Sequence, residues 1–156
     1  MAGNMKIKKN MSKTRRIIFI LGRLLLSLIF IIAGIKKIFY WSAIQESVVM
    51  KFCSHSMHFP ESSITEMMIH YVPLLIGLAT FFELAGALIL LSGYFIRVGA
   101  IFLLIFLIPT TLIYHDFWFQ VGDTRTVEMA MFMKNLAIIG SLLLLSLGPR
   151  FKKKEK

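Results

Sequence analysis

The sequence contains little cysteine and little charge. Its one cysteine, Cys53, cannot form an intramolecular disulfide, a CxxC redox pair or a thiolate-bound cluster. Dithiol chemistry and an iron–sulfur cluster held by one chain alone are therefore excluded, and the sequence shows no flavin or haem motif. Charged residues make up 17% of the 156 residues and hydrophobic residues 57%, above the roughly 45–50% typical of soluble domains. We expect a membrane protein.

The basic residues are concentrated at the two ends of the chain. Lys and Arg total 18 against 8 acidic residues, for a formal net charge of +10. Because most of these bases lie in the tails 1–16 and 149–156, we expect them to set orientation and contact anionic lipid, not nucleic acid. The apolar stretch after the first tail is longer than a secretory signal core and lacks a cleavage site, which predicts an uncleaved anchor.

Four apolar runs predict four membrane-spanning helices at residues 17–39, 72–91, 95–114 and 130–147. Each is close to the ~20 residues that cross the hydrocarbon core. The short turn at Gly93 makes the second and third runs an antiparallel hairpin. The predicted fold is an all-α four-transmembrane-helix bundle in a single domain, 17–148, with an outer loop at 40–71 that contains a surface helix near 43–52.

The distribution of Lys and Arg predicts the orientation. Both tails and the turn beside Arg97 are basic, whereas the outer loops contain two bases, Lys51 and Arg125, and six acidic residues. By the positive-inside rule, both termini are therefore cytoplasmic.

Glu83 is the clearest ionisable residue inside a predicted span. It lies eleven residues after Val72, about 16 Å from the outer edge at 1.5 Å per residue. Such a residue needs a partner, and we expect Arg23 of the first span to supply it. Small residues share the helix face of Glu83, which therefore points at another helix: Ala79, Thr80, Gly86 and Ala87.

Further polar residues gather toward the outer ends of the spans. Lys37 shares an inward face of the first span with Arg23, Ser27, Phe30 and Gly34, whereas Lys36 lies on another face. We expect Lys37, His115 and Lys134 at a similar depth, where cations near an acid could hold a quinone carbonyl or an anionic headgroup. The candidate catalytic residues are Glu83 and His115, the latter as a proton donor. The candidate cofactor-binding residues are Arg23, Lys37, Lys134 and Asn135.

Two features of the sequence remain open to more than one interpretation. Buried charges can fix helix register without any chemistry, and interfacial lysines can extend to the membrane surface. Pro109 of the third span either opens a cavity through a kink or serves packing alone.

The outer loop contains groups that suit Cu(I): Cys53, His55, Met57, His58, Met67, Met68 and His70. Their spacing fits no metal template, and methionines in such a segment usually pack against lipid or the bundle. No metal is therefore assigned.

The chain resembles the DoxX family over about residues 21–147. The resemblance rests on the segment from Glu83 to Gly93, Arg97, the segment from Pro109 to Trp118, the segment from Lys134 to Gly140, and Arg23 with the Gly34-x-x-Lys37 step. It implies a bacterial inner-membrane four-helix protein, and some relatives are similar to the membrane subunit of thiosulfate:quinone oxidoreductase. The long His- and Met-rich outer loop departs from a typical member.

Two functional hypotheses follow. The first is a quinone-associated subunit of a membrane redox complex, in which electrons come from a partner subunit or directly from a substrate. The second is a non-catalytic membrane scaffold or an oligomeric small-solute carrier, whose buried charges hold the helices together.

Overall fold

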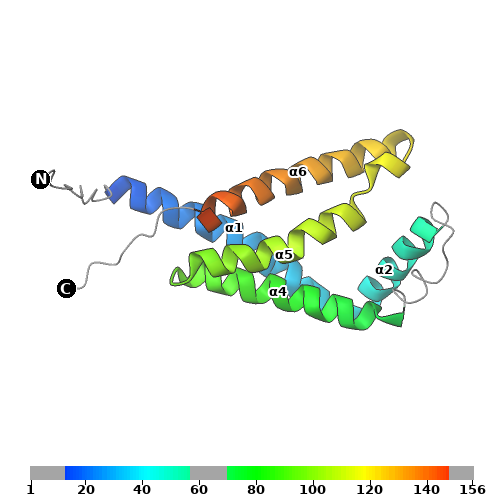
Figure 1. Cartoon of the computed structure of the whole chain (residues 1–156), viewed down its shortest axis with the longest axis horizontal. Coiled ribbons are helices and arrows are strands. Elements are labelled where there is room, and N and C mark those ends of the chain that lie inside the picture. Colours follow the sequence, from blue (N-terminus) through cyan, green and yellow to red (C-terminus); the bar gives the residue numbers. More distant parts are fainter. Residues whose placement is uncertain (1–12, 57–69, 148–156) are drawn as a thin grey trace, which may run out of the picture.

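The computed structural model describes residues 13–56 and 70–147, and over these residues the chain is helical with no strand. The elements in chain order are α1 (Lys13–Phe39), α2 (Trp41–Ser56), α4 (Val72–Ser92), α5 (Ile96–Tyr114), the 3₁₀ turn η1 (Phe117–Phe119) and α6 (Gly122–Leu147) (Figure 1). Four of them, α1, α4, α5 and α6, are long and apolar enough to cross a bilayer. The predicted all-α, four-span fold is confirmed.

Helices α4 and α5 form the predicted hairpin. Gly93 ends α4 in the left-handed conformation, with φ of 79°, which glycine adopts without strain. Beside the turn, the helices approach so closely that a Cβ on Gly99 would lie 2.8 Å from the carbonyl oxygen of Gly86. Small residues thus permit backbone contact between these helices, as is common in membranes.

Helix α1 packs antiparallel along α4 through the inward face predicted from its periodicity. Its buried residues are Ser27, Phe30 and Gly34. A Cβ on Gly34 would lie 2.5 Å from Leu84, so this glycine lets α4 approach α1 closely. Because Arg23 lies beside Gly93, the part of α1 before Arg23 extends past the α4–α5 turn (Figure 1).

Helix α2 follows α1 after a bend at Tyr40, where helical hydrogen bonds continue from Tyr40 to Lys36 and from Ile44 to Tyr40. It is longer than the predicted surface helix, and it packs against the outer end of α4. Val48 of α2 joins Val72 and Ile76 of α4 in a small outer hydrophobic cluster, to which Tyr114 of α5 also belongs.

The larger hydrophobic cluster fills the middle and the inner half of the membrane domain, toward the two tails. Its buried residues come from α1, α4, α5 and α6: Phe30, Ala87, Leu90, Ala100, Leu103, Leu104, Phe106, Leu107 and Leu142. Helix α6 packs mainly on α5 and η1, and it buries little besides Asn135 and Leu142. It begins eight residues before the predicted span.

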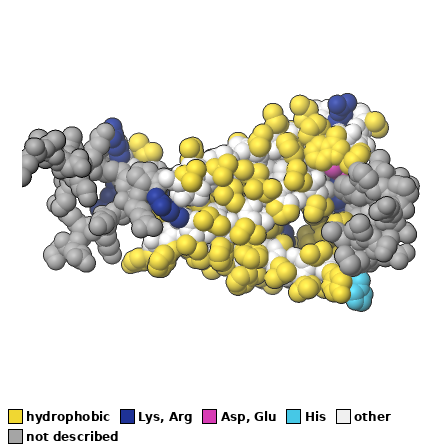
Figure 2. All heavy atoms as spheres, in the orientation of Figure 1, with side chains coloured by type: hydrophobic (Ala, Val, Ile, Leu, Met, Phe, Trp, Pro, Cys, Tyr) yellow, Lys and Arg dark blue, Asp and Glu magenta, His cyan; other side chains and the backbone are white. Residues whose placement is uncertain are grey.

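The outside of the helices is apolar. Many exposed side chains are large and hydrophobic, among them Ile101, Ile105, Ile108 and Leu112 along one side of α5. Yellow side chains accordingly cover most of the face in Figure 2. This surface suits contact with lipid chains.

Candidate functional site

An ion pair lies at the centre of the membrane domain. The Lys37 ammonium donates a hydrogen bond of 2.6 Å to Oε2 of Glu83. The ammonium also lies 4.3 Å from the ring centroid of Phe106 on α5, a cation–π contact. Gly34 of α1 lies beside the carboxylate, because a Cβ there would be in van der Waals contact with Oε2, at 3.4 Å. Three helices thus enclose one charged pair.

The two members of the pair differ in accessibility. The Glu83 side chain is 2% exposed, whereas that of Lys37 is 20% exposed. Charges inside a membrane protein are stabilised when each has a partner of opposite sign. The prediction that Glu83 faces another helix is therefore confirmed, as is the inward orientation of Lys37.

The predicted pairing of Glu83 with Arg23 is wrong. Arg23 donates a hydrogen bond of 3.3 Å to the carbonyl oxygen of Leu91 in the last turn of α4. Its guanidinium group covers Gly93, where a Cβ would lie within 2.2 Å of it. A cation is favourable at this end of a helix because unpaired carbonyl groups point toward it. Arg23 therefore holds the α4–α5 turn and does not reach the centre of the domain.

His115 belongs to a second polar group near the outer ends of α5 and α6. Its Nδ1 lies 2.8 Å from Oε2 of Glu128 on α6, so the carboxylate accepts a hydrogen bond when Nδ1 carries a proton. Both side chains are about one-quarter exposed. His115 follows Phe106 by nine residues, about 13 Å at the helical rise. It therefore lies farther out than the Lys37 ammonium, and the predicted common depth is wrong for Lys37.

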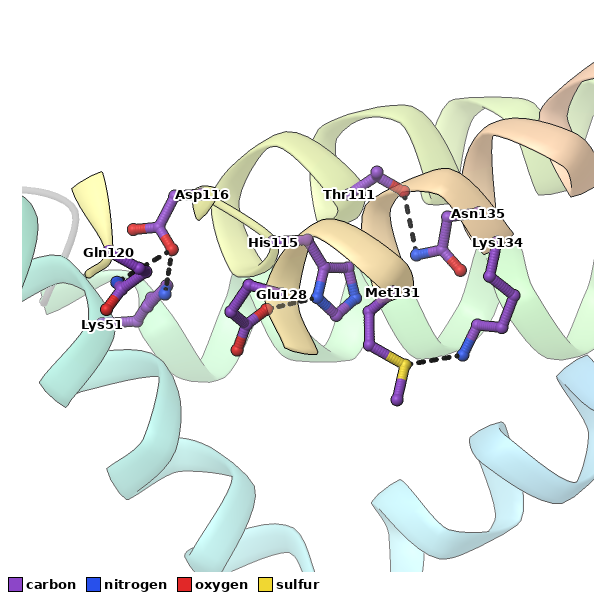
Figure 3. A network of polar contacts seen from close by, with 9 residues as sticks. All are labelled: Lys51, Thr111, His115, Asp116, Gln120, Glu128, Met131, Lys134 and Asn135. Atoms are coloured by element: carbon purple, nitrogen blue, oxygen red, sulfur yellow. Dashed lines mark hydrogen bonds and ion pairs between the residues drawn. The ribbon is translucent and has the colours of Figure 1, made fainter. Parts of the chain in front are cut away.

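Asn135 and Lys134 occupy different environments on α6 (Figure 3). The amide of Asn135 is buried and donates a hydrogen bond of 3.1 Å to Oγ1 of Thr111, which in turn donates to the carbonyl oxygen of Leu107. This bond fixes the rotation of α6 on α5. Lys134 is exposed, and its ammonium lies 3.2 Å from the sulfur of Met131.

A further ion pair, not expected from the sequence, links α2 to the segment after α5. Lys51 donates a hydrogen bond of 2.5 Å to Oδ1 of Asp116, which also accepts one from Gln120. Asp116 is buried. One signal for this ion pair was present in the sequence, because Lys51 is one of two basic residues in outer loops that are otherwise acidic.

The outer-loop Cys, His and Met residues, to which no metal was assigned, lie mostly outside the described part of the chain. Cys53 and His70 are both exposed, and the side chains of the other five lie outside the described residues. Among the described side chains, those of residues 13–53 and 70–147, no three His, Cys, Asp or Glu gather closely enough to hold a metal ion.

The site residues thus form two groups, a central pair of Lys37 with Glu83 and an outer group on α5 and α6. The DoxX family model matches residues 18–116, a segment that contains both members of the central pair. The chain belongs to the DoxX family. The inner membrane protein YphA of Escherichia coli (strain K12) is 27% identical over 137 residues, which cover 86% of each chain. No solved structure matches this DoxX protein.

Family and structure together place this DoxX protein in the bacterial inner membrane. Its four spanning helices make it a multi-pass protein in contact with the lipid bilayer.

Proposed function

We propose that this DoxX protein is a quinone-associated subunit of a membrane redox complex. The observation that carries the proposal is the Lys37–Glu83 pair, which presents an ammonium, a carboxylate and the Phe106 ring at one place inside the bilayer. An ammonium has three donors, so Lys37 can bind a quinone carbonyl oxygen while it keeps its bond to Glu83. Glu83 can accept or return a proton.

The chemistry of quinones suits such a pair. Reduction of a quinone to a quinol takes up two electrons and two protons, and the protons must reach the carbonyl oxygens inside a medium that disfavours free ions. The sequence carries no motif for a bound redox centre. The electrons therefore come from a partner subunit or directly from a substrate, and this chain supplies the binding site and the acid.

The outer group has a supporting role in this proposal. His115, in contact with Glu128, lies between the central pair and the outer surface, where its imidazole can donate or accept hydrogen bonds. In this proposal, Lys134 and Asn135 of α6 are residues that bound the quinone site on its outer side. Arg23 is assigned to the α4–α5 turn and not to the quinone.

Photoaffinity labelling with an azido-quinone tests the proposal. Membranes that contain the wild-type protein, Lys37→Met or Lys36→Met are irradiated, and the labelled peptides are identified by mass spectrometry. Lys36 is the matched control because it is exposed one position away. We expect labelled peptides from α1 and α5 in the wild type and in Lys36→Met, and a loss of about tenfold in Lys37→Met, the effect of one strong polar contact. Equal labelling of the three proteins would overturn the proposal.

The alternative is a scaffold or a small-solute carrier in which the pair only holds α1 on α4. The observation that favours it is the close fit of Gly34 against Leu84 and Glu83. Under this alternative, Glu83→Gln lowers stability but leaves quinone-linked electron transfer in native membranes unchanged. Purification in mild detergent, with identification of bound lipids and proteins, separates the two, because a redox complex retains a quinone or a partner subunit and a scaffold retains phospholipid.

A further inference from the structure

The outer half of the membrane domain is packed more loosely than the inner half. Helices α4 and α5 leave the Gly93 turn side by side and diverge toward their other ends (Figure 1). Pro109 lies inside α5, in the half of the helix away from the Gly93 turn, and a proline within a helix removes a backbone hydrogen bond and tends to bend the axis. The space-filling view shows a hollow toward this end of the molecule, with basic side chains visible in its depth (Figure 2).

The accessibility of Lys37 agrees with an opening at this place. Its ammonium contacts Glu83 and Phe106 in the middle of the domain, yet its side chain is 20% exposed. Thr110 lies one turn beyond Phe106 on the same side of α5 and is also partly exposed. Two positions on this side of α5, the Lys37 side chain beside Phe106 and Thr110 one turn farther out, are thus both accessible.

Polar groups lie along the outer half of the domain, some of them buried and others partly or fully exposed. Around Glu83 the charged neighbour is Lys37 of α1, and α5 contributes Phe106. Farther out lie His115, which follows α5, and Glu128 and Lys134 of α6. The side chains of Glu128 and Lys134 point away from the α6 axis, toward the side where α1 and α2 run (Figure 3). Lys51 of α2 and Asp116 follow at the outer end.

The opposite side of the same helix is apolar. Ile101, Ile105, Ile108 and Leu112 recur at helical spacing along α5, and all four are exposed. At the same depth in the membrane, one side of α5 therefore suits water and the other suits lipid. Water stabilises charged and hydroxyl groups, and lipid suits the isoleucine face.

We propose that the outer half of this DoxX protein encloses a water-accessible vestibule that opens to the outer aqueous phase and ends at the Lys37–Glu83 pair. A proton from the outer aqueous phase passes through the water of the vestibule to the Glu83 carboxylate, which becomes a neutral acid, and it returns to that phase when the carboxylate is restored. The central pair therefore exchanges protons with the outer side of the membrane. Where the pair serves a quinone, a step that rests on the proposed function, the protons taken up on reduction to the quinol enter from that side.

Cysteine accessibility tests the vestibule with two matched pairs of positions in a Cys53→Ser background. On α5, Thr110→Cys lies on the side of Phe106 and Leu112→Cys on the lipid side, two residues apart. On α6, Met131→Cys lies beside Lys134 and Met133→Cys lies on the opposite side; the parent methionines are 39% and 53% exposed. A charged, membrane-impermeant methanethiosulfonate reagent is added to intact cells, and the labelling rates are measured.

The proposal expects Thr110→Cys and Met131→Cys to react at least about tenfold faster than Leu112→Cys and Met133→Cys, because a thiol reacts as the thiolate, which forms in water and not in lipid. The controls discriminate well, because without a bilayer Met133 and Leu112 are more exposed than Met131 and Thr110. Exposure alone would therefore predict the opposite order of labelling rates. Equal rates within both pairs, whether slow or fast, would overturn the vestibule. Elution of each variant as a single peak in detergent verifies that it is folded.

A third pair tests where the vestibule ends. Lys37→Cys and the neighbouring control Lys36→Cys are each made in the Glu83→Gln background, so that no unpaired carboxylate is left in the interior. Labelling of Lys37→Cys about tenfold faster than Lys36→Cys is expected, and equal rates would show that water does not reach the pair. These measurements need no quinone, so their failure is distinct from a failure of the photoaffinity experiment.

Discussion

Stability measurements on the central ion pair provide the sharpest energetic test of the structure. Removal of one partner of a buried pair costs about 3–5 kcal/mol, because the remaining charge stays uncompensated. Lys37→Met is expected at the upper end of this range, since it leaves a carboxylate whose side chain is 2% exposed. Glu83→Gln is expected at the lower end, because the remaining ammonium is 20% exposed and still lies 4.3 Å from the Phe106 ring centroid.

The double variant determines whether the two residues act as one unit. With both charges removed, Lys37→Met/Glu83→Gln is expected to lose only about 1–2 kcal/mol, the cost of a buried amide without its former partner. The coupling free energy between the two positions is then about 6 kcal/mol, well above the ~0.6 kcal/mol average for interhelical hydrogen bonds in a membrane protein. Lys36→Met serves as the control and should change stability by less than about 0.5 kcal/mol.

Reversible unfolding in SDS, followed by the fluorescence of the two tryptophans, measures these free energies. Losses from the two single variants that simply add in the double variant, within about 0.5 kcal/mol, would refute the pairing.

Three further predictions concern the contacts between helices. Gly99→Ala should lose about 2–3 kcal/mol because its Cβ would meet backbone atoms of α4 at less than 3 Å, whereas Gly140→Ala, with nothing within 4 Å, should be neutral or slightly stabilising; SDS unfolding compares the two. Arg23→Met should lose about 1–2 kcal/mol and increase proteolysis at the α4–α5 turn, because it removes the cation from the end of α4; unchanged cleavage would contradict this role. Asn135→Leu should lose about 0.6–1.7 kcal/mol by breaking the bond to Thr111, and Thr111→Val should lose a similar amount, with no added loss when the two are combined.

The sequence was informative where helical periodicity decides the outcome. The inward face of the first span, Ser27, Phe30 and Gly34, followed from spacing alone, and the small residues around Glu83 correctly indicated a helix contact. The sequence did not predict the partner of Glu83, because the lengths of two spans do not determine how far one is shifted relative to the other along the membrane normal. Here α1 extends past the α4–α5 turn, which places Arg23 at the turn and Lys37 beside Glu83.

The outer contacts were harder to predict for a related reason. The pair of Lys51 with Asp116 joins α2 to a segment between helices, and the path of such a segment depends on what it packs against. Asp116, which lies between α5 and η1, has no helical repeat that would assign it a face. The packing of α2 on α4 also depends on the bend at Tyr40, and no typical turn residue at that position predicts this bend.

The position of the ion pair in the chain also bears on how the protein is made. Synthesis proceeds from the N-terminus, so α1 places Lys37 in the membrane before α4 leaves the ribosome with Glu83. A carboxylate at the centre of a helix opposes insertion by about 3 kcal/mol, and a lysine already present at the matching level offsets that cost. Helix α6, which packs mainly on α5, contributes nothing to the pair. The pair is therefore complete in the nascent chain once α4 and α5 have entered the bilayer, and α6 joins an assembled three-helix unit.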